Sequence, residues 1–516
     1  MAFSVVAVNR WPGIGAAALV AALVLGTLLA VVLRSEAGQS LGASDWAAVR
    51  FTMSQALVSA GLSVMLAIPV ARALARRTFP GRSVLITLLG APFILPVIVA
   101  VLGLLAVFGR NGWVSQGLES IGLPPVSIYG FHGVVLAHMF FNLPLATRLI
   151  LQGWQDIPSE RFRLAAQLGF DAKGIARLLE WPMLARVLPG AFAIVFAICL
   201  TSFAVALTLG GGPKATTIEL AIYQAFRFDF DLGRAAFLSC LQMAIAGTAA
   251  VLALTVSSQT GFGRGFDRVT QRWDARSALT KLLDTLLILC AAMFLILPLT
   301  AVVLAGLPAL FALPNSVYHA AFLSLSIALT STVILLLLAL PLAATIAQSR
   351  TGLTESIGFL SLAASPLVIG TGLFIVLFPL ADPFALAVPV TALVNAVMAL
   401  PFALRILVPG MRDVLGQYGP LAQTLGVQGL GIWRLLILPR LRPQIGFAAG
   451  LGAALSTGDL GVIALFADPQ RATLPLQMYR LMGAYQMETA AAAGLLLVVL
   501  SLFLFWICDK GGRWRA

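Results

Sequence analysis

The chain has 516 residues, of which 60% are apolar and only 10% are charged. Soluble globular proteins carry about 25% charged residues, so this composition excludes a water-soluble fold, and the high apolar content excludes a disordered chain. The formal net charge of +13 is compatible with nucleic-acid binding, but the placement of the basic residues favours a membrane protein.

Long uncharged stretches predict the membrane-spanning helices, because a helix needs about 20 residues to cross the hydrocarbon layer. The longest stretch, 285–349, is long enough for two crossings and is punctuated near its middle by Gly306 and Pro314. Each stretch is apolar on all sides instead of alternating, which favours helices over barrel strands. We therefore expect an all-α polytopic membrane protein with about twelve transmembrane helices. The uncharged stretches are 11–33, 51–71, 83–109, 120–147, 187–213, 235–263, 285–349, 356–381, 383–404, a run after Arg442, and 489–508.

The basic residues predict the orientation of these helices. If the N-terminus is cytoplasmic and twelve spans alternate, 25 of the 33 basic residues lie on the cytoplasmic side and 8 on the outer side. Cytoplasmic loops of membrane proteins carry the excess of Lys and Arg. We therefore expect both termini in the cytoplasm, and this arrangement accounts for the net charge without nucleic acid.

An internal repeat divides the chain into two parts. Residues 164–184 read LAAQLGFDAKGIARLLEWPML and residues 421–441 read LAQTLGVQGLGIWRLLILPRL, with 11 of 21 positions identical at a constant offset of 257. An even number of spans in each copy makes the copies parallel repeats, related by an axis along the membrane normal. We predict a first six-helix half at 1–257, a cytoplasmic linker at 258–281 and a second six-helix half at 282–516.

Each copy of the repeat predicts a short helix, a glycine and a second short helix in a cytoplasmic loop. The first helix is expected to start at Ser159 or at Gly419-Pro420, and the second to end at Pro182 or Pro439. An apolar face on such a loop is suited to docking in a groove of a partner, and the alternative is an elbow packed on the protein's own helices. The expected apolar residues are Leu164, Ala165, Leu168, Ile175, Leu178 and Leu179, and Leu421, Ala422, Leu425, Ile432, Leu435 and Leu436.

This loop resembles the EAA loop of bacterial binding-protein-dependent ABC importer permeases, in which it is the coupling helix that seats in a cytoplasmic ATPase. The leading Glu of the family falls on Arg163 and Pro420 in this chain. Whether the chain makes the salt bridge from that Glu to the ATPase is therefore an open question. The resemblance implies ATPase-coupling residues at Leu164, Ala165, Gly169 and Pro182, and at Leu421, Ala422, Gly426 and Pro439.

Further stretches are similar to the fused permeases of thiamine importers, in which one chain carries both six-span halves. The resemblance implies a type I ABC importer permease fold, the bacterial inner membrane, and alternating access that imports thiamine or its phosphate esters from a periplasmic thiamine-binding protein. It also implies that ATP and Mg²⁺ are used by a separate cytoplasmic ABC ATPase dimer, so that this chain is no enzyme and needs no cofactor. The stretches are ALARRTFPGR (73–82), GRNGW (109–113), LAHMFFNLPLATRLILQ (136–152), TLGGGPKATTIELAIYQAF (208–226) and GDLGVIALF (458–466).

Two alternatives remain at this point. Fused permeases for ferric iron and other ions share the loop motif, so the cargo rests on the resemblance. An ion-coupled secondary transporter with two parallel halves would need several intramembrane acids or histidines as a proton relay, and only Asp459 is plainly in the middle of a span.

Asp459 is the most conspicuous candidate for the translocation pathway. An ionised group in the middle of a span costs about 2.5–3.5 kcal/mol on insertion scales, so such residues commonly face a cavity or a partner. A carboxylate would suit a substrate with a fixed thiazolium cation. The alternative is a helix break in which the side chain bonds neighbouring backbone beside Gly458 and Gly461.

Two tyrosines and two histidines are weaker candidates. Tyr223 and Tyr479 recur in both halves and could stack on an aromatic cation or anchor the helices at the outer interface. His132 and His138 do not share a helical face, and the four cysteines lie in apolar runs without metal-ligand spacing. No metal site is predicted.

Overall fold

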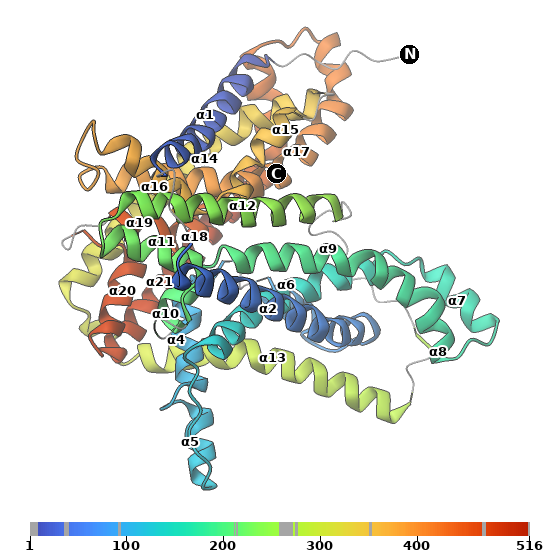
Figure 1. Ribbon diagram of the computed structural model, residues 1–516. Coiled ribbons are helices and arrows are strands. Elements are labelled where there is room, and N and C mark those ends of the chain that lie inside the picture. Colours follow the sequence, from blue (N-terminus) through green and yellow to red (C-terminus); the bar gives the residue numbers. More distant parts are fainter. Residues whose placement is uncertain are drawn as a thin grey trace.

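The chain folds as a bundle of helices in the computed structural model (Figure 1). The structure describes residues 9–35, 41–90, 94–210, 212, 215–256, 272–273, 277–349, 353–466 and 471–513, and this part of the chain contains no strand. Within it, eleven helices are long and apolar enough to cross a membrane, and the apolar helix α16 (Pro366–Leu377) is shorter. The all-helical, polytopic prediction is therefore confirmed.

The helices form two sets of similar order. The first set comprises α1 (Trp11–Arg34), α2 (Ala43–Arg76), α3 (Arg82–Leu88), α4 (Val97–Phe108), α5 (Trp113–Ser120), α6 (Phe131–Gln155), α7 (Ser159–Gln167), α8 (Ala172–Ile175), a π-helical turn (Ala176–Glu180), α9 (Trp181–Leu200), α10 (Ala204–Leu209), α11 (Ile218–Arg227) and α12 (Leu232–Val256). The second set comprises α13 (Ala278–Gly306), α14 (Asn315–Gln348), α15 (Leu353–Gly358), α16, α17 (Ala387–Thr424), a π-helical turn (Ile432–Ile437), α18 (Leu438–Thr457), α19 (Gly461–Phe466), α20 (Leu474–Gly483) and α21 (Met487–Arg513). Among the described residues, the second set has no separate counterparts of α5, α7 and α8.

Two of the predicted spans are interrupted. The stretch 83–109 forms α3 and α4. In the stretch 356–381, a short 3₁₀ turn separates the end of α15 from α16. Pro96 caps the start of α4, and Pro366 occupies the first turn of α16, where its missing N–H costs nothing. The stretch Val97–Ser120, which holds α4 and α5, is long enough to cross a membrane, whereas α16 is too short, which explains why the described residues hold eleven candidate spans instead of twelve.

The first helix of each set packs on the other set. α1 lies against α14 and α16, and α13 lies against α2 and α4. Arg10, just before α1, donates to the carbonyl of Gln348 at the end of α14 (3.2 Å), while Asp284 in α13 accepts from Arg76 at the end of α2 (2.7 Å). The predicted halves of consecutive helices are thus joined by an exchange of their first helices. Most of the predicted linker, namely residues 258–271 and 274–276, lies outside the described residues.

A glycine permits each of these exchanges. A methyl group added to Gly103 in α4 would lie 2.4 Å from the carbonyl oxygen of Pro298 in α13. The same addition to Gly372 in α16 would lie 2.4 Å from the carbonyl oxygen of Thr27 in α1. Small residues allow this close approach of helix backbones in membrane proteins. In both sets, a glycine of the shorter helix therefore allows the exchanged first helix to pack closely.

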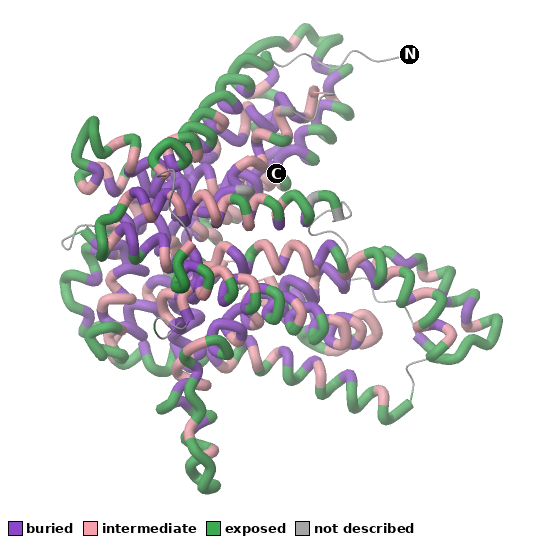
Figure 2. Tube along the Cα trace, in the orientation of Figure 1, coloured by how far each residue is buried: buried purple, intermediate pink, exposed green. Residues whose placement is uncertain are grey.

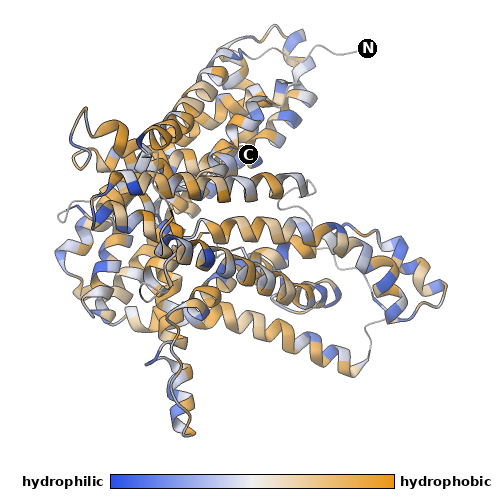
Figure 3. Cartoon of the chain, in the orientation of Figure 1, coloured by the Kyte–Doolittle hydropathy of each residue, from blue (hydrophilic) through white to orange (hydrophobic). Residues whose placement is uncertain are grey.

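The distribution of buried and of apolar residues agrees with two packed helix sets in a membrane. The buried residues concentrate where the two helix sets meet (Figure 2). Apolar residues cover most of the helix surfaces, and hydrophilic residues gather around α7 and α8 (Figure 3). Exposed leucines along α1, α13 and α14 fit a lipid environment, in which apolar side chains need no protein partner.

Candidate functional site

The two copies of the repeat fold alike after their first helices. We call residues 159–182 the first repeat loop and residues 416–439 the second. Gly169 and Gly426 adopt φ values of +71° and +65°, a left-handed conformation that glycine adopts without steric cost. In each loop the N–H of the residue after the glycine donates to a carbonyl of the preceding helix, that of Ala165 in the first loop and that of Ala422 in the second (both 2.9 Å). The predicted helix–glycine–helix arrangement is confirmed.

Two details of the predicted loops are wrong. No helix starts at Pro420, because α17 continues from Ala387 to Thr424 and loses only the bond that the proline cannot donate. Pro182 and Pro439 do not end the second short helix but lie in the first turn of α9 and α18. The N–H groups of Trp181 and Leu438, just before the prolines, donate to carbonyls five residues earlier. A π-helical turn therefore precedes each proline and continues into the long helix.

The repeat loops expose leucines at equivalent positions. Leu164 and Leu421 are both 56% exposed, and the pairs Leu168 and Leu425, and Leu178 and Leu435, are exposed to a similar extent. The opposite face is buried at Ala165 and Ala422, and at Ile175 and Ile432, while Leu179 and Leu436 are half-buried. The predicted apolar face is therefore divided: its small and β-branched members hold the loop to the bundle, and its leucines face outward.

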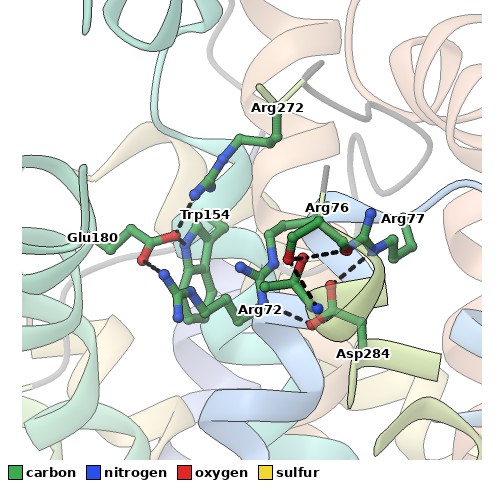
Figure 4. Close-up of polar contacts among 9 residues, drawn as sticks. Arg72, Arg76, Arg77, Trp154, Glu180, Arg272 and Asp284 are labelled. Carbon is green, nitrogen blue, oxygen red and sulfur yellow. Dashed lines mark hydrogen bonds and ion pairs between the residues drawn. The ribbon is translucent and has the colours of Figure 1, made fainter. Parts of the chain in front are cut away.

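The first repeat loop is also held by ion pairs (Figure 4). Glu180, in the π-helical turn, is buried and accepts from Arg72 of α2 (2.7 Å), Arg272 (2.9 Å) and the indole N–H of Trp154 (3.3 Å). The Arg272 guanidinium also lies 4.6 Å from the centroid of the Phe162 ring in α7. Arg272 thus connects the described part of the predicted linker to both helical segments of this loop.

A cavity of about 360 Å³ lies between the two helix sets. Its walls come from the starts of α4 and α16, the middle of α6, the connections α9–α10 and α18–α19, and the start of α11. Most of the wall is apolar, and its polar side chains are His138, Asn142, Thr201, Ser202, Glu219 and Asp459. Such an apolar pocket with a few polar groups is the usual form of a small-molecule site.

Asp459 lies in this cavity at the break between α18 and α19. Its Oδ1 accepts from the backbone N–H of Gly461 (3.2 Å), as the helix-break interpretation expected. Its Oδ2 is buried and has no hydrogen-bond partner among the described residues. The helix-break interpretation therefore describes the geometry of Oδ1, and the part of Asp459 in a translocation pathway stays a prediction.

Glu219 is a cavity residue that the sequence analysis missed. Thr217 caps α11, and the N–H of Ile218 donates to Thr52 of α2 (3.0 Å), which places the following carboxyl group inside the bundle. Glu219 is fully buried, and its Oε1 accepts from Gln242 of α12 (2.9 Å). The available signal was a single acid flanked by apolar residues in IELAIY, within a segment expected to be an outer loop.

Tyr223 and Tyr479 do not line the cavity. Tyr223 is buried, and its ring centroid lies 5.2 Å from that of Phe203, which does line it. Tyr479 is half-buried and packs against the apolar cluster to which Tyr223 belongs. The tyrosines of the two sets therefore share an apolar cluster, and their part in a pathway stays a prediction.

His132 and His138 lie in α6 but have different surroundings. His132 Nε2 contacts the carbonyl of Ser127 at an exposed position, whereas His138 is buried and is hydrogen-bonded through Nδ1 to Ser59 (3.3 Å). In the part of the chain that the structure describes, no three His, Cys, Asp or Glu residues are grouped as metal ligands.

Curated proteins resemble the chain over almost its whole length. The thiamine transport system permease protein ThiP of Brucella abortus (strain 2308) is 39% identical over 518 residues, covering 97% of this chain and 95% of the relative. ThiP of Salmonella typhimurium is 40% identical over 517 residues, covering 97% and 96%. The sulfate transport system permease protein CysW of Synechococcus elongatus is 27% identical over 187 residues, covering 35% and 63%. No family model matches the chain. The extent and identity of the first two alignments show that the chain belongs to the thiamine transport system permease protein ThiP family.

Proposed function

We propose that this chain is the membrane-spanning permease subunit of an importer for thiamine and its phosphate esters. The observation that carries the proposal is the full-length similarity to thiamine permeases at 39–40% identity. The eleven helices suited to crossing a membrane, among the described residues, support a multi-pass location in the inner membrane. The excess of basic residues on one side supports cytoplasmic termini.

The repeat loops are proposed to transmit movement from a cytoplasmic ABC ATPase dimer, which binds ATP and Mg²⁺ in place of this chain. The exposed leucines at equivalent positions, such as Leu164 and Leu421, give each ATPase subunit a similar apolar surface. Gly169 and Gly426 fix the turn that presents them, and Pro182 and Pro439 lie where each loop joins a long helix. Arg163 and Pro420 stand where the usual loop Glu would be, so docking relies on apolar contact.

The cavity between the helix sets is proposed to be part of the translocation pathway. ATP-driven closure of the ATPase dimer would open it toward a docked, loaded periplasmic binding protein, and hydrolysis would reset it. Because coupling between sites is reciprocal, the outward-open state should bind the loaded binding protein more tightly, and that protein should stimulate ATP turnover.

Reconstitution tests the proposal. The chain is incorporated into proteoliposomes with its native ATPase and binding protein, and uptake of radiolabelled thiamine is followed. Uptake that requires both ATP and the loaded binding protein is expected. Uptake of ferric iron and not of thiamine would show that ferric iron is the cargo. Uptake by this chain alone along an ion gradient would support a secondary transporter instead.

A further inference from the structure

A second cavity lies beside the exchanged helix α13. It has a volume of about 820 Å³ and is lined by the end of α2, the turn that follows it, α3 and the first part of α13. We call it the α13 groove, and it shares no lining residue with the cavity between the helix sets. Arg72, one helical turn before Arg76 in α2, pairs with Glu180 of the first repeat loop (2.7 Å). The end of the groove at Arg76 therefore lies on the side of the bundle that carries the repeat loops.

The turn between α2 and α3 decides which basic side chains reach the groove. α2 ends at Arg76, and the chain turns at Gly81, whose φ of +85° is left-handed, before α3 begins at Arg82. Arg82 is buried and donates through Nε to the carbonyl of Leu74 (3.1 Å), so the fold itself uses this guanidinium. Arg76 and Arg77 line the groove instead.

This end of the groove has an excess of positive charge. Arg76 donates through Nη2 and Arg77 through Nε to the two oxygens of Asp284 (both 2.7 Å; Figure 4). One carboxylate thus serves two guanidinium groups, and the exposed Lys281 adds a third basic group. No Asp or Glu is among the described residues that line the groove. Nη2 of Arg77 is buried and has no hydrogen-bond partner in the described part of the chain. Because a buried donor without a partner loses the free energy of its hydration, this end favours an anionic acceptor.

Beyond its basic end the groove is apolar. The residues of α13 that line it recur at intervals of three or four and therefore share one face of the helix. The helical rise from Lys281 to Ile296 is about 22 Å. α13 is hydrophilic at its start and hydrophobic along the rest of its length (Figure 3). The groove therefore changes from basic to apolar along a membrane-spanning helix, which is the order of headgroup and acyl chain in a phospholipid. The lining residues of α13 are Lys281, Thr285, Ile288, Leu289, Ala292 and Ile296.

We propose that the α13 groove binds one anionic phospholipid, with its phosphate at Arg77 and Lys281 and an acyl chain along α13. Basic pockets between transmembrane helices are suited to anionic headgroups. A soluble phosphate would use the basic end alone, and a soluble partner protein would not follow the apolar part into the span. A lipid in contact with α2, α3 and α13 together fastens the exchanged helix to the first set. This proposal does not depend on which cargo the chain imports.

Lipid binding to the full-length chain measures this site. The tagged chain in a neutral detergent is titrated with radiolabelled phosphatidylglycerol or phosphatidylcholine, and the lipid retained after capture of the chain is counted. Phosphatidylglycerol is expected to bind about tenfold more tightly, because phosphatidylcholine carries its own cation. Lys281→Gln is expected to weaken phosphatidylglycerol binding about fivefold, the effect of one basic group near an anionic lipid. Ala292→Trp fills the apolar part, keeps every charge and is expected to weaken binding about tenfold or more.

Matched variants separate the groove from the rest of the surface. Lys173→Gln removes an exposed lysine of the first repeat loop, and Met293→Trp adds the same ring at an exposed position of α13 outside the groove lining. Both are expected to bind phosphatidylglycerol like the wild type. Unfolding midpoints of all four variants show whether a loss reflects misfolding, and if one groove variant unfolds, the other decides.

Three results would overturn the proposal. The first is equal binding of the two lipids by the wild type. The second is wild-type binding of phosphatidylglycerol by the folded groove variants. The third is displacement of the lipid by glycerol 1-phosphate at the same concentration, which would show that the basic end binds a soluble phosphate and that the apolar part contributes nothing.

Discussion

Arg272 donates through Nη2 to Oε1 of Glu180 at 2.9 Å, joining the region between the helix sets to the π-helical turn of the first repeat loop (Figure 4). Both side chains are nearly inaccessible to solvent, with exposed fractions of 3% and 4%. The second loop has Ile437 at the position of Glu180, also buried. The two loops therefore share their outer leucines but differ beneath them, one being fixed by charge and the other by apolar packing.

Glu180→Gln should destabilise the chain. Arg72 and Arg272 would then face a neutral amide, and the free energy of unfolding should fall by about 2–3 kcal/mol. This loss is smaller than that for breaking a fully buried ion pair, because Arg72 is partly exposed. The apparent unfolding midpoint of the detergent-purified chain measures the effect. Glu488→Gln is the control at an exposed site, and equal midpoints for the two variants would show that the ion pairs contribute nothing.

The exchange of the first helices can be tested at a glycine. Gly103→Ala places a methyl group 2.4 Å from the carbonyl oxygen of Pro298, which is backbone and cannot rotate away. The unfolding free energy should fall by about 1–3 kcal/mol, as for other overpacked interiors. Gly61→Ala in α2 meets no atom within 4 Å and should leave the unfolding midpoint unchanged or raise it slightly. A similar midpoint for both variants would argue against the contact of α4 with α13.

The sequence predicted the features that depend on local chemistry. The glycine turns and the apolar loop faces could be read from the repeat because glycine, proline and arginine are distinctive among apolar residues. The repeat could not show which face of each loop is buried, since Ala165 is covered by the bundle while its neighbour Leu164 is not. Local spacing describes a loop but does not specify what packs against it.

The exchange of first helices and the role of Glu219 depend on tertiary contacts. Any apolar helix can pack against several others, so the stretch 11–33 gave no sign that α1 lies on the second set. Glu219 belongs to a short helix that Thr52 holds inside the bundle, although its segment is polar enough to be taken for an outer loop. Asp459 was recognisable because its flanks are long and uncharged, whereas those of Glu219 are short.

The glycine turns should matter more for coupling than for stability. Gly169→Ala and Gly426→Ala place a side chain in the left-handed region, at a cost of about 1 kcal/mol each, without any neighbouring atom to meet. The reconstituted complex should show reduced thiamine uptake per ATP hydrolysed, because the loop shifts away from its docked position. Gly122→Ala imposes the same strain on an open turn after α5 and should leave this ratio unchanged. An equal ratio in all three variants would contradict a coupling role.

The exposed leucines test whether the repeat loops dock by apolar contact. Leu164→Ser and Leu421→Ser remove one side chain from each loop, both 56% exposed, so each should change the unfolding free energy by less than about 0.5 kcal/mol. If an ATPase subunit covers these side chains, truncating either should weaken its association with the chain by about tenfold, the effect of losing a buried interface anchor. Pull-down of the ATPase by the tagged full-length chain measures the association. Leu123→Ser, at a 50% exposed position after α5, is the control and should retain the ATPase. Retention by Leu164→Ser and Leu421→Ser as well would mean that the loops serve the protein's own packing.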